Sequence, residues 1–259
     1  MPACRCLIRQ VCMHVVRRCG LWSLSVLPHL VLLPGMDGTG DCFSPFLKCL
    51  STAISYTVIN YDNGIPMDYD SIEVSIRKQL PLEVPFIILG ESFSGPIAIS
   101  IAAAPPENLI GVVFVCTFAR NPQPMLTWLK PFIRFTPIKS APKSAMQYFI
   151  LGSHATASLN TMLHAAIDQV SEEVLRFRAA LVLDIDYTNL IDKISLPCLY
   201  FVATQDRVVP RAASQYMFDR LSNVRVEEIN APHFLLQVEP VQAAKLIEKF
   251  VISLTVEIE

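Results

Sequence analysis

The stretch PFIILGESFSGPIAISIAAAPP, residues 85–106, decides the fold of this chain. It runs from a continuous apolar segment, residues 85–90, through Gly-Glu-Ser-Phe-Ser-Gly into an Ala- and Ile-rich segment, residues 94–104. An ordinary connection between a strand and a helix does not need a serine with small residues on both sides. A strained turn that exposes a hydroxyl does need them, so the pattern predicts a strand, a sharp turn at Ser92 and a helix.

Similar apolar runs recur on both sides of this stretch. They are continuous rather than alternating in polarity, which is typical of strands in a parallel sheet that helices cover on both faces. The pattern predicts strands at residues 29–34, 56–61, 85–90, 109–117, 197–204 and 224–230. It predicts helices at residues 43–50, 70–80, 94–104, 211–221 and 241–254. The expected fold class is therefore α/β, with a mostly parallel central sheet flanked by helices.

The alternation of strands and helices stops between residues 121 and 189, where prolines and helical segments occur without a strand pattern. We therefore expect a helical insertion over residues 121–189 and a core made of residues 29–120 and 190–259. Residues 1–28 precede the first core strand, and we expect a poorly ordered N-terminal extension there. Four cysteines lie in its first 19 residues, but their spacing differs from the C-x2-C pairs of zinc sites.

The composition limits the classes of function. The chain has 259 residues, of which 52% are hydrophobic and 17% charged, and its net charge is −2. These values argue against disorder and against nucleic-acid binding by the chain as a whole. Cys116 and Cys198 lie in apolar runs, where cysteine acts as a small hydrophobe. We expect a reducing, cytoplasmic location, with export through an N-terminal signal as the alternative.

A serine needs a base and an orienting acid to act as a nucleophile. When the serine follows a strand on such a turn, the order along the chain is serine, acid, histidine. Asp206 comes directly after the strand at residues 197–204, and His233 lies in the loop after the next strand. We therefore predict that Ser92, Asp206 and His233 are the catalytic residues.

Each of these residues also has a simpler interpretation. Ser92 could cap the following helix, Asp206 could stabilise a loop, His233 could be structural, and Ser94 is a rival nucleophile two residues later. The rival acids precede the strand and are expected at the wrong end of the sheet: Asp184, Asp186 and Asp192. The rival histidines come too early or lie in the insertion: His14, His29, His154 and His164.

The loop GMDGTG, residues 35–40, follows the first core strand and is a candidate oxyanion hole. Backbone N–H groups commonly stabilise the oxyanion of a tetrahedral intermediate. We expect the N–H of Met36 to act with that of Phe93, the residue after the nucleophile. Asp37 is expected to stabilise the turn. The loop lacks the Lys-Ser/Thr end of a phosphate-binding loop, and no metal or organic cofactor is implied.

With these motifs in this order, the chain resembles the α/β-hydrolase superfamily of serine esterases and thioesterases. The resemblance covers about residues 29–254 and rests on PGMDGTG, GESFSG, QDRVVP and APHFLLQ. Two positions depart from the usual pattern. Ser94 stands where G-x-S-x-G ends in glycine, and Pro34-Gly35 replaces the usual His-Gly. Serine is small and the oxyanion hole uses backbone donors, so neither departure removes the chemistry.

The resemblance implies a cap-bearing serine hydrolase that cleaves small-molecule carboxylic esters through an acyl-enzyme on Ser92. A serine at the turn argues against dehalogenases and epoxide hydrolases, which use aspartate there. Two alternatives stay open. One is a thioesterase or acyltransferase that acts on acyl-CoA or acyl carrier protein with the same three residues. The other is a non-catalytic protein that uses the pocket as a receptor.

The insertion has an uneven charge distribution. No acidic residue occurs between Glu107 and Asp168, but five basic ones do: Arg120, Lys130, Arg134, Lys139 and Lys143. Apolar residues, among them Trp128 and Phe132, are interleaved with them. The commoner explanation of such a pattern is a solvated face with its apolar side against the sheet. The alternative is a basic, apolar mouth for an acyl group on an anionic carrier, or for an anionic membrane surface.

Overall fold

Six parallel strands form the centre of the protein. The computed structural model describes residues 13–18, 21–133 and 135–258. The strands are β3 (His29–Leu33), β4 (Tyr56–Val58), β5 (Phe86–Glu91), β6 (Leu109–Val115), β7 (Cys198–Ala203) and β8 (Val224–Ile229). Their order across the sheet is β4-β3-β5-β6-β7-β8, and every neighbouring pair is parallel. The predicted α/β class is confirmed, and all six expected strands are present.

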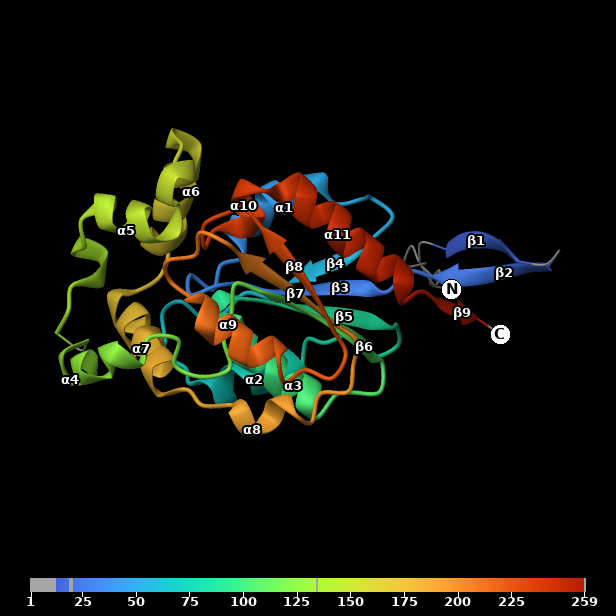
Figure 1. Ribbon diagram of the computed structural model, residues 1–259, viewed down its shortest axis with the longest axis horizontal. Helices are drawn as coiled ribbons and strands as arrows, with labels where there is room; N and C mark the ends of the chain where they lie inside the picture. Colours follow the sequence, from blue (N-terminus) through green and yellow to red (C-terminus); the bar gives the residue numbers. More distant parts are fainter. Residues whose placement is uncertain (1–12, 19–20, 134, 259) are drawn as a thin grey trace, which may run out of the picture.

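Helices cover both faces of this sheet (Figure 1). One face carries α1 (Ser44–Cys49), α10 (Leu235–Val238) and α11 (Pro240–Ser253). The other carries α2 (Tyr69–Arg77), α3 (Gly95–Ala103), α8 (Thr188–Ile191) and α9 (Arg211–Phe218). Val31 and Leu33 pack into one apolar core, whereas Leu30 and Leu32 pack into the other. Because both faces of each strand are covered, the strands have continuous apolar sequences.

The helices of the described residues are short. The longest, α11, has 14 residues, whereas a helix needs about 20 apolar residues to cross a bilayer. No helix in the described part of the chain combines the length and the apolar character that a membrane span requires.

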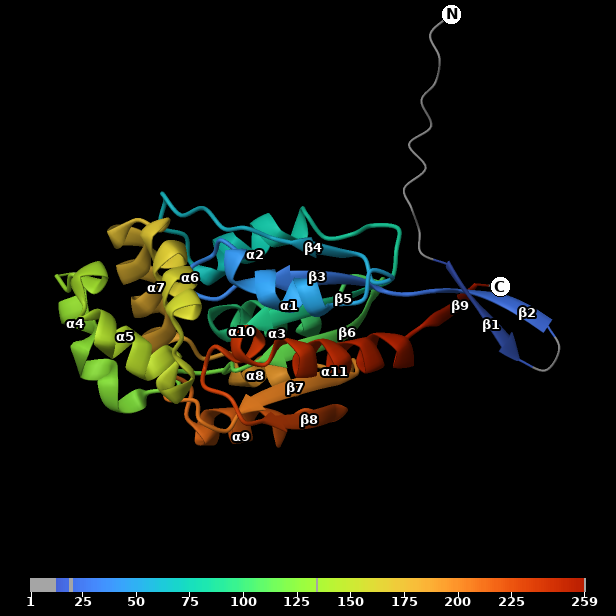
Figure 2. The ribbon, with the colours of Figure 1, turned by 90° about the horizontal axis from the view of Figure 1, so that it is seen from above.

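Residues 121–189, which we call the cap, lie beyond the carboxyl ends of the strands (Figures 1 and 2). The cap contains α4 (Lys130–Ile133), α5 (Lys143–Ile150), α6 (Ala157–Asp168) and α7 (Glu172–Asp184), with 3-10 turns η3 (Pro124–Leu129), η4 (Ile138–Ser140) and η5 (Gly152–His154). Its two connections to the core lie side by side. The N–H of Asn121 donates to the carbonyl of Ile185, and that of Tyr187 donates to Ala119.

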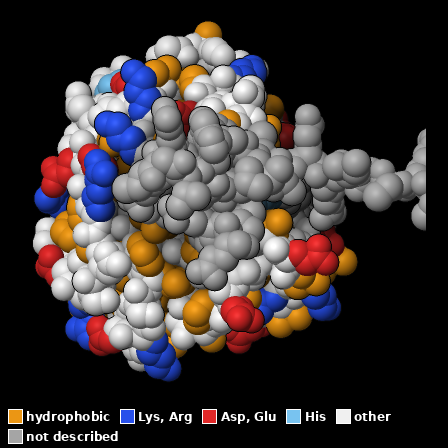
Figure 3. Space-filling view, turned by 90° about the vertical axis from the view of Figure 1, so that its right-hand side faces the viewer, with side chains coloured by type: hydrophobic (Ala, Val, Ile, Leu, Met, Phe, Trp, Pro, Cys, Tyr) orange, Lys and Arg blue, Asp and Glu red, His pale blue; other side chains and the backbone are white. Residues whose placement is uncertain are grey.

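A second, antiparallel sheet projects from the opposite end of the molecule (Figure 2). It contains β1 (Met13–Arg18), β2 (Leu21–Val26) and β9 (Val256–Ile258), in the order β1-β2-β9. The sequence analysis predicted no strand in these segments. Acidic and basic side chains are both visible on this end of the molecule (Figure 3). The four N-terminal cysteines and Arg134 lie outside the described residues.

Candidate active site

Ser92 lies on a sharp turn between β5 and α3, at the start of the 3-10 turn η2 (Ser92–Ser94). Its φ of 49° is in the left-handed region, which non-glycine residues rarely adopt. The turn also needs a small neighbour, because a Cβ added to Gly95 would lie 1.7 Å from Oγ1 of Thr117. The Thr117 hydroxyl donates to the carbonyl oxygen of Ser92 at 2.5 Å. The sharp turn predicted from the sequence is therefore present and is held by a side chain just after β6.

The structure brings Ser92, Asp206 and His233 together. Oγ of Ser92 lies 2.8 Å from Nε2 of His233. Nδ1 of the same ring lies 2.8 Å from Oδ2 of Asp206. The side chains of His233 and Asp206 are only 8% and 5% exposed, so water competes little for these hydrogen bonds. The three residues form one continuous chain of hydrogen bonds, which is the geometry that a catalytic triad requires.

The carboxylate of Asp206 is fixed through its second oxygen. Oδ1 accepts the N–H groups of Val208 at 2.8 Å and Val209 at 2.9 Å. These bonds form a tight turn directly after β7, and they orient Oδ2 toward His233. The turn therefore positions the imidazole ring as well as the acid.

The rival residues lie elsewhere. Asp192 is paired with Arg220 at 2.5 Å, on the surface. His29 begins β3, at the amino end of the sheet, and its ring bonds to Ser55 and Thr57. The carboxyl ends of parallel strands meet at the opposite edge of the sheet, where Ser92, Asp206 and His233 lie.

Ser94 is fully buried, and its hydroxyl is engaged away from His233. It donates to the carbonyl oxygen of Pro34 and lies 2.6 Å from the hydroxyl of Tyr61. Pro34 is the residue before the predicted oxyanion loop. The serine that replaces the usual glycine therefore links the turn at Ser92 to that loop, a bond that glycine could not make.

The predicted oxyanion loop is a hydrogen-bonded turn. The N–H of Gly38 donates to the carbonyl of Gly35 at 3.1 Å. The carboxylate of Asp37 accepts the N–H of Thr39 at 3.0 Å and its hydroxyl at 2.5 Å, so Asp37 stabilises the turn as expected. Among the described residues, the N–H of Met36 takes part in no backbone hydrogen bond of a loop or turn. The N–H of Phe93 lies in η2, at the start of the helix that follows Ser92.

Arg178 of the cap reaches this loop, and the sequence analysis missed it. Its side chain is almost completely buried, with only 2% of the residue exposed. Nη1 donates to the carbonyl of Met36 at 2.8 Å and to Oδ1 of Asn63 at 3.1 Å, and Nη2 donates to the carbonyl of Asp62 at 2.9 Å. Arg178 thus holds the residue whose N–H is the predicted oxyanion donor. A signal was present, because Arg178 follows buried Val174 by four residues on the inner face of α7.

A second carboxyl group, that of Glu91, is buried directly before Ser92 in the chain. Nε2 of Gln237 donates to its Oε1 at 3.1 Å. Burial raises the pKa of Glu91 to about 7; the charge of Asp37 adds to this shift, and the bond from Gln237 opposes it. Glu91 therefore changes its charge near neutral pH, next to the proposed nucleophile.

The pKa of His233 reflects opposing influences. Burial lowers it, but the charge and hydrogen bond of Asp206 and the charge of Glu91 outweigh burial, so the pKa is raised above the ordinary 6.5. The environment thus favours the imidazolium form, which arises when a histidine takes a proton from a serine.

Cys116, Asp206 and His233 bring possible metal-ligand atoms within 4.8 Å of one another. A thiolate is the form of cysteine that binds metals. Burial raises the pKa of the Cys116 thiol well above its usual value, with Asp206 and Glu91 adding to the shift. Both ring nitrogens of His233 already face Ser92 and Asp206. The chemistry of this group therefore fits a hydrogen-bond network better than a metal site.

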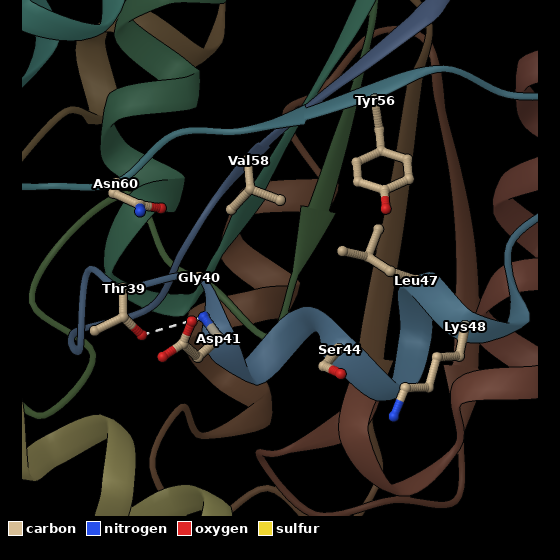
Figure 4. Close-up of a pocket in the computed structure, with 9 residues that line it drawn as sticks. All are labelled: Thr39, Gly40, Asp41, Ser44, Leu47, Lys48, Tyr56, Val58 and Asn60. Carbon is tan, nitrogen blue, oxygen red and sulfur yellow. Dashed lines mark hydrogen bonds between the residues drawn. The ribbon is translucent and has the colours of Figure 1, made fainter.

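A pocket of about 460 Å³ lies between α1 and the edge strand β4 (Figure 4). Its lining residues are Thr39, Gly40, Asp41, Ser44, Leu47, Lys48, Tyr56, Val58 and Asn60. Tyr56 projects from β4 toward Leu47 of α1 (Figure 4). None of the three predicted catalytic residues lines this pocket, so it is separate from the chemistry predicted at Ser92.

Comparison with protein families identifies the class of the chain. The family model of the S33 serine aminopeptidases matches residues 60–235. This span is more than half of the chain, and it contains Ser92, Asp206 and His233. The chain belongs to this family of α/β hydrolases. Among curated proteins, none matches this hydrolase.

Solved structures with a similar fold include two esterases and a lactonase. The esterase from Thermogutta terrifontis is 15% identical, covers 95% of this hydrolase with 99% of its own chain, and has a TM-score of 0.75. The esterase from Exiguobacterium antarcticum is 16% identical, with coverages of 89% and 96% and a TM-score of 0.74. The enol-lactonase from Burkholderia xenovorans LB400 is 15% identical, with coverages of 88% and 90% and a TM-score of 0.74. At these identities the likeness establishes the fold.

Proposed function

We propose that this α/β hydrolase is a serine hydrolase that cleaves carboxylic esters through an acyl-enzyme on Ser92. One observation carries the proposal, the chain of two 2.8 Å hydrogen bonds from Ser92 through His233 to Asp206. It occurs on a turn whose backbone at Ser92 is in the left-handed region, a strained conformation of the kind found at active sites. The esterases among the structural neighbours agree with this choice of substrate class.

In the first half of the reaction, Oγ of Ser92 attacks the acyl carbon. Nε2 of His233 takes the hydroxyl proton, and Asp206 holds Nδ1–H and stabilises the imidazolium. The carbonyl oxygen gains a negative charge, which the N–H groups of Met36 and Phe93 stabilise. When the intermediate collapses, the ester C–O bond breaks and the alcohol leaves with the proton from Nε2.

In the second half, a water molecule attacks the acyl-enzyme. Nε2 of His233 takes a proton from this water, and a second tetrahedral intermediate forms with its oxyanion in the same place. Collapse breaks the bond between the acyl carbon and Oγ of Ser92. The proton returns to Oγ, and the carboxylic acid leaves. Each residue ends in its starting state.

The same residues would cleave an acyl thioester, which differs only in its leaving group. The basic span of the cap between Glu107 and Asp168 favours an anionic carrier such as coenzyme A as the second candidate. The family name suggests a third, an amide substrate. These candidates differ in the bond that breaks and not in the residues that break it.

The test is hydrolysis of matched substrates by the wild type and by Ser92→Ala. We would compare p-nitrophenyl esters from acetate to palmitate, the corresponding acyl-CoA thioesters and a p-nitroanilide. We expect the esters to give the highest kcat/KM, with a maximum at one chain length. Removal of Oγ should lower kcat by about 10,000-fold or more, because no other nucleophile is in place.

Ser94→Ala is the matched control, because it removes the rival hydroxyl two residues away. It should lower stability through the lost bond to Pro34 but retain covalent labelling by a fluorophosphonate, which Ser92→Ala should lose. Labelling that survives Ser92→Ala and disappears in Ser94→Ala would reject Ser92 as the nucleophile. A folded wild type that hydrolyses none of the substrates would favour the receptor alternative.

A further inference from the structure

Two buried side chains connect the strand before the proposed nucleophile to the helix after the proposed base. Glu91 is the last residue of β5 and directly precedes Ser92, and Gln237 belongs to α10, which follows His233. Glu91 is 6% exposed and Gln237 is 4% exposed. Nε2 of Gln237 donates to Oε1 of Glu91 at 3.1 Å. This hydrogen bond therefore joins β5 to α10 through groups that water hardly reaches.

The single hydrogen bond does not satisfy either side chain. The amide oxygen of Gln237, Oε1, is buried and has no hydrogen-bond partner in the structure. In the described part of the chain, no ion pair involves the carboxyl group of Glu91. A buried acceptor without a donor is unfavourable, and so is a buried charge without a counter-charge. Both features need an explanation in the same place.

The groups around Glu91 make its ionised form unfavourable. Burial raises the pKa of Glu91 to about 7, and the charge of Asp37 in the loop after β3 adds to the shift. The thiols of Cys42 and Cys116 also lie near this carboxyl group, and burial raises the pKa of each, so both stay neutral. His233 favours the ionised form, but only when its own ring is protonated.

One proton on Glu91 would complete both groups. A carboxylic acid and a primary amide each present one donor and one acceptor in a plane, so they can form two parallel hydrogen bonds. The first of these is the observed bond from Nε2 of Gln237 to Oε1 of Glu91. The second would run from the O–H of Oε2 of Glu91 to the unpartnered Oε1 of Gln237. The buried amide oxygen would then have its donor, and no buried charge would remain.

We propose that Glu91 is the neutral acid of such a pair with Gln237, and that this pair fixes the spacing of Ser92 and His233. The two bonds hold the end of β5 against α10. They thereby keep Oγ of Ser92 within 2.8 Å of Nε2 of His233. Glu91 and Gln237 are positioning residues, because they act through Ser92 and His233. Their effect on catalysis rests on the proposed hydrolysis, whereas the protonation of Glu91 does not.

Infrared spectroscopy of the full chain measures this protonation directly. Ordinary aspartate and glutamate side chains titrate near pH 4, so at about pH 6 nearly all of them are carboxylates. The wild type should still show the carbonyl band of a protonated carboxyl group at about pH 6. This band should disappear as the pH rises above about 7. Glu91→Gln should lack it, because the variant has no carboxyl group at this position.

Gln237→Leu tests the pair from the side of the amide. It keeps the approximate volume but removes both hydrogen bonds. The carboxyl band of Glu91 should move to higher frequency, as it does when a carbonyl group loses a hydrogen bond. We expect kcat for p-nitrophenyl acetate to fall by about ten-fold with little change in KM, because displaced catalytic groups lower the rate more than binding. Glu91→Gln should lose less activity than Glu91→Leu, since its amide can form the same two bonds.

The matched control is Gln215→Leu, which breaks an amide–carboxylate bond near the surface. Nε2 of Gln215 donates to Oδ1 of Asp219 at 2.6 Å, at the end of α9. This variant should keep both the infrared band and the kcat of the wild type. Circular dichroism shows whether Gln237→Leu is folded. If it is not, the absence of the band in Glu91→Gln still tests the protonation of Glu91.

Three results would overturn the proposal. A wild type without the band at about pH 6 would mean that Glu91 is ionised and that Oε1 of Gln237 has another donor, such as a buried water. A band that remains in Glu91→Gln would belong to a different residue. A folded Gln237→Leu with an unchanged band and unchanged kcat would show that the pair does not form. By contrast, a wild type that shows the band but hydrolyses no ester would support the pair and reject only the proposed reaction.

Discussion

Helix α3 and the outer cap segment, residues 124–133, are both apolar in sequence, but they have opposite surroundings. Seven of the nine residues of α3 are buried, because the helix packs on β5, β6, α2 and α8. No residue of η3 or α4 is buried, and in the described part of the chain the cap segment packs mainly on α7. Apolar composition therefore does not decide what is inside. A segment is buried only where other elements surround it.

The largest expected effect is a loss of kcat, and it concerns the carboxyl end of the sheet, where the reaction is proposed to take place. Asp206→Asn keeps the size of the side chain and an acceptor for the N–H groups of the turn. It removes the charge that stabilises the imidazolium, and kcat should fall by about 1,000- to 10,000-fold. Asp192→Asn, which breaks an exposed pair with Arg220, should leave kcat nearly unchanged in the same assay. Similar losses in both variants would contradict the proposed role.

The difference in burial between α3 and the cap segment can be tested by measuring the stability of one variant in each. Ile101→Ala in α3 removes a side chain with 0% exposure and should lower the free energy of unfolding by about 2–5 kcal/mol. Phe132→Ala removes a larger side chain from the cap and should change it by only about 0.5 kcal/mol. Urea denaturation of both variants measures the two values. If Phe132→Ala costs as much as Ile101→Ala, the cap segment is covered in solution.

Arg178 connects the cap to the core, because its side chain donates to the carbonyl of Met36 in the loop after β3. Arg178→Lys keeps the charge, but an ammonium cannot replace the planar fork that holds Met36, Asn63 and Asp62. We expect kcat/KM to fall by about 10- to 100-fold, mainly through kcat, because the oxyanion donor loses its position. Arg176→Lys, on the same helix but at the surface, is the control. A loss of thermal stability without a change in kcat would mean that Arg178 is only structural.

The smallest expected effect is a shift in the pH dependence of kcat/KM, caused by the buried carboxyl group of Glu91 next to Ser92. Below its pKa, His233 is protonated and cannot accept the serine proton, so kcat/KM should rise as pH rises through that pKa. The half-maximal pH should lie above 6.5, since the pKa of His233 is raised. Glu91→Gln removes one of the charges that raise it and should shift the profile to lower pH. The exposed Glu83→Gln should not, and a shift to higher pH in Glu91→Gln would contradict this electrostatic account.

The candidate catalytic residues could be predicted because each follows a strand. A parallel sheet brings the carboxyl ends of its strands to one edge, so order and spacing were enough to place Ser92, Asp206 and His233 together. The positions that the analysis missed do not follow a strand of the parallel sheet. Arg178 lies in the cap, and β2 pairs with β9, which is more than 200 residues away in the chain. Contacts of this kind depend on the path of the whole chain.

The sequence by itself determined the parallel sheet, the turn at Ser92 and the order of serine, acid and histidine. These features follow from the pattern of apolar residues along short segments and from the small residues that a sharp turn requires. Both can be read from a few neighbouring residues. Only the tertiary structure decided that Arg178 holds the loop of Met36, that Ser94 bonds to Pro34, and that Trp128 faces outward. Burial and pairing are properties of neighbours in space, and a residue type alone does not specify its neighbours.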